Sequence, residues 1–456
     1  LVIEKKHGKD IEPKKFRELC RDYASEQVER QKKDFERLGV LADWDNPYLT
    51  LDKKIEANIV RSLAKIYKNN FLYQGSKPVH WCTDCGSALA EAEVEYEDKT
   101  SAAIDVSFIL EDSSNKIFSN IKAKKVSAII WTTTPWTLPA NEAISVHPDL
   151  IYGLYELSDQ YLIIAEDLAQ HNALKYKKSI KQINSFKGRE MEGLICCHPF
   201  LDKRVPIICG EHVTIESGTG LVHTAPAHGL DDYIVGSKYG LQVDNPVDGQ
   251  GRFKKDTPHV SGLTVWESNT KIIDLLKKEN ALLFEEKYTH SYPHCWRHKT
   301  PIIFRATQQW FIGMNHENQN KSLRDLAIKS VSETKFFPFW GKARLEAMIK
   351  NRPDWCVSRQ RNWGVPIPIF LHKDTLAPHP KTLSYLDVIA HMIEKEGIDA
   401  WFDLDTRNFL GDDADNYQKI SDTLDVWFDS GTTHESVLSE RKDLTSQADL
   451  YLEGSD

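Results

Sequence analysis

The feature that most constrains the fold of this chain is a change in the spacing of its apolar residues. From about Ser101 the apolar residues alternate with smaller or polar ones, as Ile104, Val106 and Phe108 do. Alternation with a period of two is typical of β-strands that have one buried face. Short apolar runs separated by turn residues follow, with the sequences VSAIIW, YLIIA and VPIIC. The middle of the chain is therefore predicted to be rich in β-strands.

Helical spacing is found on both sides of this block. One amphipathic helix is predicted between Pro13 and Gly39, and a second is predicted through Ile55 to Ile66. After Tyr292 the chain is mixed, with helices expected at 323–331, 345–349 and 386–393 and strands at 365–371 and 424–428. A change of period on both sides of a block indicates an α/β fold with an inserted β-rich domain. We expect four segments, at residues 1–96, 97–290, 291–352 and 353–456.

Length and charge limit the class of protein. The 456 residues amount to about three times the ~150 residues of a typical domain. No apolar run reaches the ~18 residues of a membrane span, and the first residues lack the pattern of a secretory signal. We therefore expect a cytoplasmic protein. The net charge of −9 argues against nonspecific coating of a polyanion and leaves room for local basic patches.

Two short motifs far apart in the chain contain residues that bind metals. WCTDC supplies Cys82 and Cys85, and HCWRH supplies Cys295 and His298. Tetrahedral zinc is commonly held by two such pairs, because each turn offers two donor atoms from one side. Eight cysteines in 456 residues are too few for a disulfide framework. The four residues are therefore candidate zinc ligands, and the alternative is a metal-free pair of hairpins that has kept its thiols.

Threonines are concentrated at the end of a predicted strand. In WTTTPWTLPAN, Thr132, Thr133 and Thr134 follow the strand-like run, and a proline that cannot donate a backbone hydrogen bond comes next. Hydroxyls at the rim of a sheet can donate to a ligand and accept from it. Threonine is also a good strand former, so a purely structural role is the alternative.

A glycine-containing segment, GTGLVHTAPAHGLDDY at 218–233, brings four polar residues close together in sequence. His223, His228, Asp231 and Asp232 lie within ten positions of one another. They are predicted to form either a metal site or a ligand pocket with a carboxylate for a cationic group. A single histidine or aspartate in such a loop would more often be structural.

Two further motifs combine arginine with tryptophan near the end of the chain. They are PDWCVSRQRNWGVPIP at 353–368 and DTLDVWFDSG at 422–431. Arg359 and Arg361, with Trp355 and Trp363, suit a site that holds phosphate or a nucleotide. The alternative is a solvated arginine next to a core tryptophan.

One basic run stands out against the negative net charge. Its cationic residues are Lys175, Lys177, Lys178, Lys181, Lys187 and Arg189. Glu190 is the only acidic residue in this run that balances their positive charge. Such a run is able to contact the phosphates of a nucleic acid. An exposed charged helix or loop is the alternative.

Taken together, these motifs resemble those of the class I aminoacyl-tRNA synthetases, and specifically those of the isoleucine-specific members. WTTTPWTLPAN and GTGLVHTAPAHGLDDY resemble the two signature segments of their editing domain, the insertion called connective peptide 1. WCVSRQRNWGVPIP and DVWFDSG resemble segments of their catalytic domain. The motifs occur in the family's order, and Thr134 stands where the valine and leucine enzymes typically carry arginine.

The resemblance implies a fold and an activity. The fold would be a partial Rossmann-type catalytic domain with a β-barrel-like editing domain. The intact enzyme would attach isoleucine to its tRNA with ATP and magnesium, and the editing domain would hydrolyse mischarged valyl-tRNA without a cofactor. A second site is needed because binding alone discriminates weakly against a missing methylene, as is known for these enzymes. The expected partners of this monomer are isoleucine tRNA, isoleucine and valine, with no membrane contact.

Site roles follow from the same resemblance. Because the inserted block has no obvious Ser-His or Cys-His nucleophile, Thr132, Thr133 and Thr134 would hold an attacking water and the terminal ribose. Asp232 would pair with the α-ammonium group of the substrate. The implied substrate-binding residues are Trp136, Asn141, His223 and Trp427, of which Trp136 and His223 would narrow the pocket so that valine enters and isoleucine does not.

The chain departs from the family in two ways. The family's HIGH and KMSKS signatures are absent, and we expect them upstream of Leu1 and downstream of Asp456, so this piece alone is not expected to aminoacylate. His298 stands where relatives often have cysteine. Two other interpretations remain open: an editing piece of a valine-type synthetase, and a noncatalytic zinc-stapled module that binds tRNA.

Overall fold

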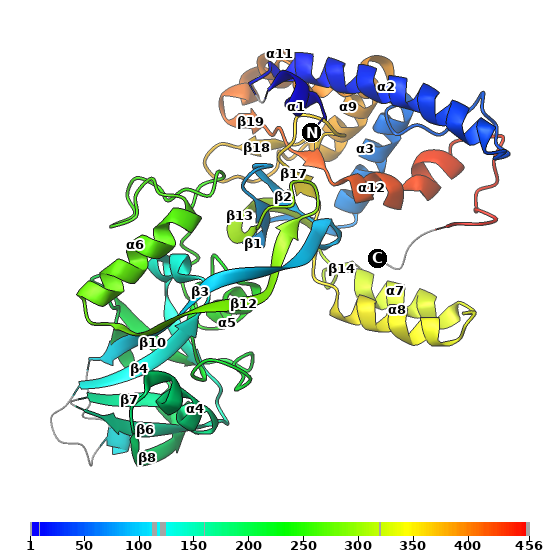
Figure 1. Cartoon of the computed structure of the whole chain (residues 1–456). Helices are drawn as coiled ribbons and strands as arrows, with labels where there is room; N and C mark the ends of the chain where they lie inside the picture. Colours follow the sequence, from blue (N-terminus) through cyan, green and yellow to red (C-terminus); the bar gives the residue numbers. More distant parts are fainter. Residues whose placement is uncertain are drawn as a thin grey trace. The chain divides into compact units, whose positions relative to one another are not determined.

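The structure, a computed structural model, describes residues 2–8, 10–111, 116–118, 125–158, 160–318 and 321–452 (Figure 1). The chain forms two compact units. Unit 1 comprises Leu1–Gly75 and Gln309–Asp456, and unit 2 comprises Ser76–Gln308. The chain leaves unit 1 within β1 (Leu72–Cys82) and returns to it within β13 (Ile303–Ile312). Unit 2 is therefore an insertion in unit 1, as the change in apolar spacing predicts, whereas the finer division into four segments stays a prediction.

Unit 1 is mixed α/β. Its longer helices are α2 (Pro13–Arg37), α3 (Lys53–Lys68), α7 (Leu323–Glu333), α8 (Trp340–Asn351) and α9 (Thr382–Glu396). The shorter ones are α1 (Val2–His7), α10 (Asp399–Phe402), α11 (Thr406–Leu410), α12 (Val426–Gly431), the 3-10 turn η5 (Gly411–Asp415) and the π-helical turn η6 (His434–Leu438). The strands are β14 (Glu317–Asn318), β15 (Lys321–Ser322), β16 (Trp355–Cys356), β17 (Ser358–Arg359), β18 (Phe370–His372), β19 (Tyr417–Lys419) and β20 (Thr423–Leu424).

Local signals explain why the unit 1 helices begin where they do. The Glu12 carboxylate accepts from the backbone amides of Lys14 and Lys15, which satisfies two of the free N–H groups at the start of α2. The helix α3 packs against α9 with its apolar face, because Ile59 and Leu63 are fully buried in the unit 1 core. The predicted helices at 13–39, 55–66 and 386–393 are therefore confirmed as α2, α3 and α9.

Unit 2 is rich in strands. They are β2 (Ser87–Leu89), β3 (Val94–Leu110), β4 (Lys125–Thr132), β5 (Ala143–Val146), β6 (Ile151–Leu157), β7 (Gln160–Ala165), β8 (Lys181–Lys187), β9 (Ile195–Cys197), β10 (Arg204–Cys209), β11 (Leu221–Thr224) and β12 (Leu282–Cys295). The helices are α4 (Glu166–Tyr176), α5 (Leu230–Lys238) and α6 (Val265–Lys278), with 3-10 turns η1 (Glu91–Glu93), η2 (Lys116–Phe118), η3 (Pro135–Ala140) and η4 (Gly188–Met191). The runs VSAIIW, YLIIA and VPIIC are confirmed as β4, β7 and β10.

A large mixed sheet forms the body of unit 2. Its strand order is β11-β5-β10-β9-β3-β4-β7-β6-β8, and β12 pairs with β3 along a long antiparallel ladder (Figure 1). Two pairs in this sheet are parallel, β10 with β5 and β4 with β7. The Ala165 amide of β7 donates to the Thr219 carbonyl at 2.9 Å, and the Tyr152 hydroxyl of β6 donates to the Gly220 carbonyl at 2.8 Å. These bonds tie the segment before β11 to strands from the other half of the sheet.

Two strand predictions in unit 1 were wrong in extent or type. Of 365–371 only Phe370 and Leu371 lie in a strand, because the prolines at 366 and 368 have no N–H for a ladder. Of 424–428 most is helical, since the Asp425 carboxylate accepts from the Trp427 amide and starts α12. An aspartate before a short apolar run is therefore a helix start here.

Candidate functional site

A chain of polar side chains joins the two motifs of unit 2. The Thr132 Oγ1 at the end of β4 lies 3.2 Å from the Thr134 Oγ1. The Thr137 Oγ1 lies 3.4 Å from the Thr134 Oγ1 and 2.8 Å from the His223 Nε2. The His223 Nδ1 in turn lies 3.5 Å from the Asn141 Nδ2. Four of the predicted site residues, Thr132, Thr134, Asn141 and His223, are thus brought into one network.

Thr137 is the network member that the sequence analysis missed. Its hydroxyl donates to the Thr134 carbonyl at 2.8 Å, a local bond of the 3-10 turn η3. The turn begins at Pro135, which has no N–H with which to continue β4. The spacing of three residues between Thr134 and Thr137 was the available signal, since residues i and i+3 lie on one side of a 3-10 turn.

The strand β11 places His223 opposite β5, where it pairs with Ile144. The preceding Gly218 and Gly220 have φ angles of +77° and +78°, and a Cβ at Gly220 would lie 2.3 Å from the Ala165 Cβ. Only glycine fits this approach. Burial lowers the pKa of His223 to about 3, so the imidazole is neutral at physiological pH and offers one donor and one acceptor nitrogen.

Asp232 lies in the first turn of α5 rather than in a loop. Its Oδ2 accepts from the Ala225 amide at 2.9 Å, directly after β11. Burial raises the pKa of Asp232 to about 6, although the hydrogen bond from the Ala225 amide lowers this pKa in part. The carboxylate is thus held at the end of β11, the strand that carries His223. Within the described residues, no side-chain hydrogen bond joins Asp232 to the threonine network.

Trp136 and His228 carry polar atoms without protein partners. The two rings meet edge to face with centroids 4.9 Å apart. The His228 Nδ1 lies 2.9 Å from the Phe304 carbonyl. The Trp136 Nε1 and the His228 Nε2 are buried and have no hydrogen-bond partner among the described residues. A bound group with both an acceptor and a donor would satisfy both atoms.

Two predicted site residues stand outside these contacts. Thr133 is half-buried, and its side chain makes no hydrogen bond within the part of the chain that the structure describes. Trp427 lies on α12 of unit 1, where it is 37% exposed. The remaining predicted residues of this site all belong to unit 2.

The four predicted metal ligands converge. The donor atoms of Cys82, Cys85, Cys295 and His298 all lie within 4.8 Å of one another. The Cys85 Sγ is 3.9 Å from the Cys295 Sγ, and the His298 Nδ1 is 3.8 Å from the Cys295 Sγ and 3.2 Å from the Cys85 Sγ. Bonds of ~2.3 Å to zinc place tetrahedral sulfur donors ~3.8 Å apart. The spacing therefore fits a tetrahedral cation.

Hydrogen bonds among the three thiols shift their pKa values in opposite directions. Hydrogen bonding to Cys295 raises the pKa of Cys82 to about 11 and raises the pKa of Cys85. Hydrogen bonds from the other two thiols lower the pKa of Cys295. Ligation of a metal ion would need all three sulfurs as thiolates, so binding would release protons.

The arginine- and tryptophan-containing motifs of unit 1 meet in a buried ion pair. The Arg359 guanidinium lies 3.0 Å from the Asp425 carboxylate, and both side chains are buried. The Trp355 Nε1 donates to the same carboxylate at 2.9 Å. Arg359 is therefore engaged within the protein, so the expected role of Arg359 in holding phosphate is wrong. Nearby, burial raises the pKa of Asp429 to about 8, with further contributions from Asp425 and Glu56.

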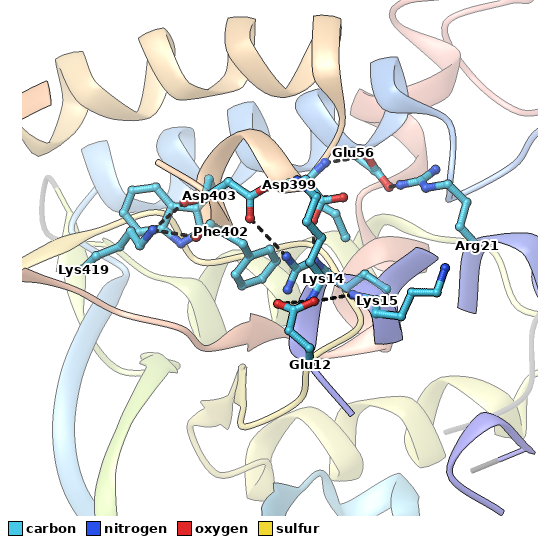
Figure 2. Close-up of polar contacts among 12 residues, drawn as sticks. Glu12, Lys14, Lys15, Arg21, Glu56, Asp399, Phe402, Asp403 and Lys419 are labelled. Atoms are coloured by element: carbon cyan, nitrogen blue, oxygen red, sulfur yellow. Dashed lines mark hydrogen bonds and ion pairs between the residues drawn. The ribbon is translucent and has the colours of Figure 1, made fainter. Parts of the chain in front are cut away.

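A separate cavity of about 530 Å³ in unit 1 is bordered by acidic residues of α9, of α10 and of the segment between α10 and α11. Figure 2 shows its polar surroundings, where Lys14 of α2 reaches Asp403 at 2.7 Å and Arg21 reaches Glu56 at 2.7 Å. Arg17 pairs with both Asp399 and Asp403. Two of the acidic residues at this cavity, Asp399 and Asp403, are thus paired with cations of α2, and these contacts hold α2 on the core.

The basic run in unit 2 is only partly available to a ligand. The Lys175 side chain is 9% exposed, and its Nζ lies 3.0 Å from Asp105 and 3.4 Å from Glu286. Arg189 pairs with Asp149. The other four lysines of the run, Lys177, Lys178, Lys181 and Lys187, are exposed.

No helix in the described part of the chain is long and apolar enough to cross a lipid bilayer.

Residues 1–456 match the family described as tRNA synthetases class I (I, L, M and V). The chain therefore belongs to the class I tRNA synthetase family. It is 57% identical over 468 residues to the isoleucine–tRNA ligase of Thiobacillus denitrificans and 58% identical over 468 residues to that of Dechloromonas aromatica. Both alignments cover 100% of this chain and 50% of the relative, so the chain spans about half the length of these curated relatives.

Among solved structures, the editing domain of the cytosolic leucyl-tRNA synthetase of P. knowlesi is 13% identical to this chain. The match covers 41% of this chain and 96% of that domain, with a TM-score of 0.34. A likeness at this TM-score supports no conclusion about fold or function.

Proposed function

We propose that this chain is part of an isoleucine–tRNA ligase and that unit 2 carries the hydrolytic site that clears valyl-tRNA. The observation that carries the editing role is the network Thr132–Thr134–Thr137–His223, which joins WTTTPWTLPAN to GTGLVHTAPAHGLDDY. The ligase identity is supported by relatives of that name that match the whole chain at 57% and 58% identity.

The proposed hydrolysis uses a positioned water. The hydroxyls of Thr132, Thr133 and Thr134 would hold this water and the terminal ribose, because each hydroxyl can both donate and accept. Holding the water in line with the ester carbonyl supplies the rate by proximity and orientation. The neutral His223 fixes the position of Thr137. No cofactor is needed for this step.

Selection in this pocket depends on charge and size. Asp232 would bind the α-ammonium group of the substrate in an ionic hydrogen bond. Trp136 and His223 would narrow the pocket so that the side chain of valine enters and that of isoleucine does not. Asn141 would hold the imidazole of His223 in orientation, since their nitrogens lie 3.5 Å apart. The buried Trp136 Nε1 and His228 Nε2 supply a free donor and acceptor for the substrate.

Unit 1 would be a part of a Rossmann-type catalytic domain that uses ATP and magnesium in the intact enzyme. Trp427 would contact the isoleucine substrate, and its amide is anchored to Asp425. In unit 2, a barrel-like closure of the sheet is supported by the bonds of Ala165 and Tyr152 to the segment before β11. The four-segment division, with the editing domain at 97–290, belongs to the same proposal.

We also propose zinc for Cys82, Cys85, Cys295 and His298. Zinc would hold the end of β1 against the end of β12, because each strand ends in one of the ligands. The partners of the whole enzyme would be isoleucine tRNA, isoleucine and valine. A cytoplasmic monomer is the form expected from the family.

The experiment is deacylation of valyl-tRNA for isoleucine by the purified chain, with isoleucyl-tRNA as the matched substrate. The proposal expects hydrolysis of the valyl ester only. Preferred hydrolysis of threonyl-tRNA would favour a valine-type editing piece instead. Binding of tRNA without any hydrolysis would favour the noncatalytic module. The chain is not expected to catalyse ATP–pyrophosphate exchange, because it contains neither the HIGH nor the KMSKS signature.

A further inference from the structure

The helices α7 and α8 lie side by side and form a hairpin with unusually exposed aromatic side chains at its turn (Figure 1). Phe337 is 92% exposed, Phe339 is 85% exposed and Trp340 is 59% exposed. None of these three rings contacts another ring within the described residues. In addition, α8 buries none of its residues. Large aromatic side chains this exposed mark a binding surface rather than a fold requirement.

The same hairpin is strongly basic. Residues 321–352 contain eight lysines and arginines and three acidic residues, a net charge of +5 in a chain whose net charge is −9. Lys335 directly precedes the aromatic cluster and has no ion-pair partner among the described residues. Lys342 follows the cluster, and among the described residues its Nζ donates only to the Ser332 carbonyl, at 3.3 Å. The two lysines therefore flank the exposed aromatic residues in sequence.

We propose that the turn between α7 and α8 and the first turn of α8 bind single-stranded nucleic acid. The rings of Phe337, Phe339 and Trp340 would stack on unpaired bases, and Lys335 and Lys342 would contact the phosphates between them. Sequence-tolerant binding of single strands rests on this combination of aromatic platforms and cations. Aromatic residues are enriched at both kinds of interface, so the preference for a nucleic acid over a protein partner rests on the lysines, which are depleted at protein interfaces.

This surface goes beyond the proposed editing function and does not depend on it. It also offers cations that are not engaged in buried pairs, unlike Lys175 of the basic run in unit 2. A duplex is a poor ligand for the site, since its bases are stacked on one another and present no free faces.

Fluorescence anisotropy of labelled oligonucleotides tests the proposal with the full chain. The probes are oligo(A) RNA of about 12 nucleotides, oligo(dA) DNA of equal length and an RNA duplex of equal length, a size within the range of known single-strand sites. We expect both single strands to bind more tightly than the duplex. The double variant Phe337→Ala/Phe339→Ala should weaken single-strand binding about tenfold or more. Tyr96→Ala, which removes an exposed aromatic ring elsewhere, should leave binding unchanged.

The lysines give an independent readout. The double variant Lys335→Gln/Lys342→Gln should reduce the slope of log K against log salt by about 0.7 for each phosphate that a lysine no longer neutralises. Folding of the variants is checked by circular dichroism and thermal unfolding, because these exposed side chains bury little surface. Unchanged binding in the Phe337→Ala/Phe339→Ala variant, or equal affinity for the duplex, would overturn the proposal. So would self-association of the chain that the aromatic variant abolishes while single-strand affinity stays the same.

Discussion

Thr137 and His223 come from different elements and approach within 2.8 Å of each other. This contact fixes a neutral imidazole between a threonine hydroxyl and the Asn141 amide. The sequence identified His223 and Asn141 as site residues by resemblance, whereas the spacing of Thr134 and Thr137 did not show that Thr137 contacts His223. That omission has a physical cause, because the contact arises only when the turn η3 and the strand β11 pack together.

Asp232 is the residue that we propose to recognise the charge of the substrate. We expect Asp232→Ala to lose valyl-tRNA hydrolysis, because the α-ammonium group would enter a partly desolvated pocket without its partner, at a cost on the order of 2 to 5 kcal/mol. Single-turnover deacylation measures the loss. Asp231→Ala is the matched control, since Asp231 is the exposed neighbour in the same turn. Similar activity in the two variants would count against the assigned role.

The pKa of Asp232 predicts a pH dependence. The carboxyl group has its pKa raised to about 6 by burial, so acidification through pH 6 protonates it and removes the charge that binds the ammonium group. The value of kcat/KM for valyl-tRNA should therefore fall as the pH drops below about 6. His223 and His228, with pKa values lowered to about 3 and about 4, stay neutral over this range. A pH profile that is flat between pH 5 and 7 would contradict the assignment.

His223 is expected to act on substrate size. In His223→Ala the pocket gains volume, so isoleucyl-tRNA should begin to be hydrolysed while hydrolysis of valyl-tRNA survives. The two rates are measured on the same enzyme preparation. Because the imidazole also contacts Thr137, His223→Gln serves as a second variant that keeps a polar group at this position. Equal loss of both activities in His223→Ala would show that His223 is a framework residue or a general base.

Among the helices and strands, the sequence predicted the type of each element better than the residues at which it begins and ends. The helices α2, α3 and α9 and the strands β4, β7 and β10 follow directly from apolar spacing. The prediction failed at 424–428, where the cap made by Asp425 outweighed a strand-like run. It also missed that the last turn of α4 carries Lys175 toward Asp105 of β3. Such long-range pairs depend on tertiary packing, which spacing along the chain does not encode.

The candidate zinc ligands at the ends of β1 and β12 lead to a prediction about metal content. We expect about one equivalent of zinc per chain, measured by inductively coupled plasma mass spectrometry. Cys295→Ser should lower the zinc content and the thermal stability, because Cys295 is fully buried among the other donors. Cys197→Ser replaces an exposed free cysteine and should retain the metal. Absence of zinc from the purified chain, or equal zinc in the two variants, would contradict the site.

At the scale of the whole molecule, one unit is inserted into another, and each holds a different set of motifs. Unit 2 contains all the proposed editing residues and the four candidate metal ligands, whereas unit 1 contains Trp427 and the buried Arg359–Asp425 pair. The change in apolar spacing on both sides of the middle block was enough to predict the insertion. Placing Thr132, Thr134 and His223 in one network required the fold, since β4 and β11 lie far apart in sequence.

The most direct test of the account is the ratio of deacylation rates for valyl-tRNA and isoleucyl-tRNA, both carried on the isoleucine tRNA, with the unaltered chain. We expect the valyl ester to be hydrolysed well above the spontaneous rate and the isoleucyl ester not to be. Equal rates for the two esters, or no acceleration of either one, would contradict the assignment of an editing site to unit 2.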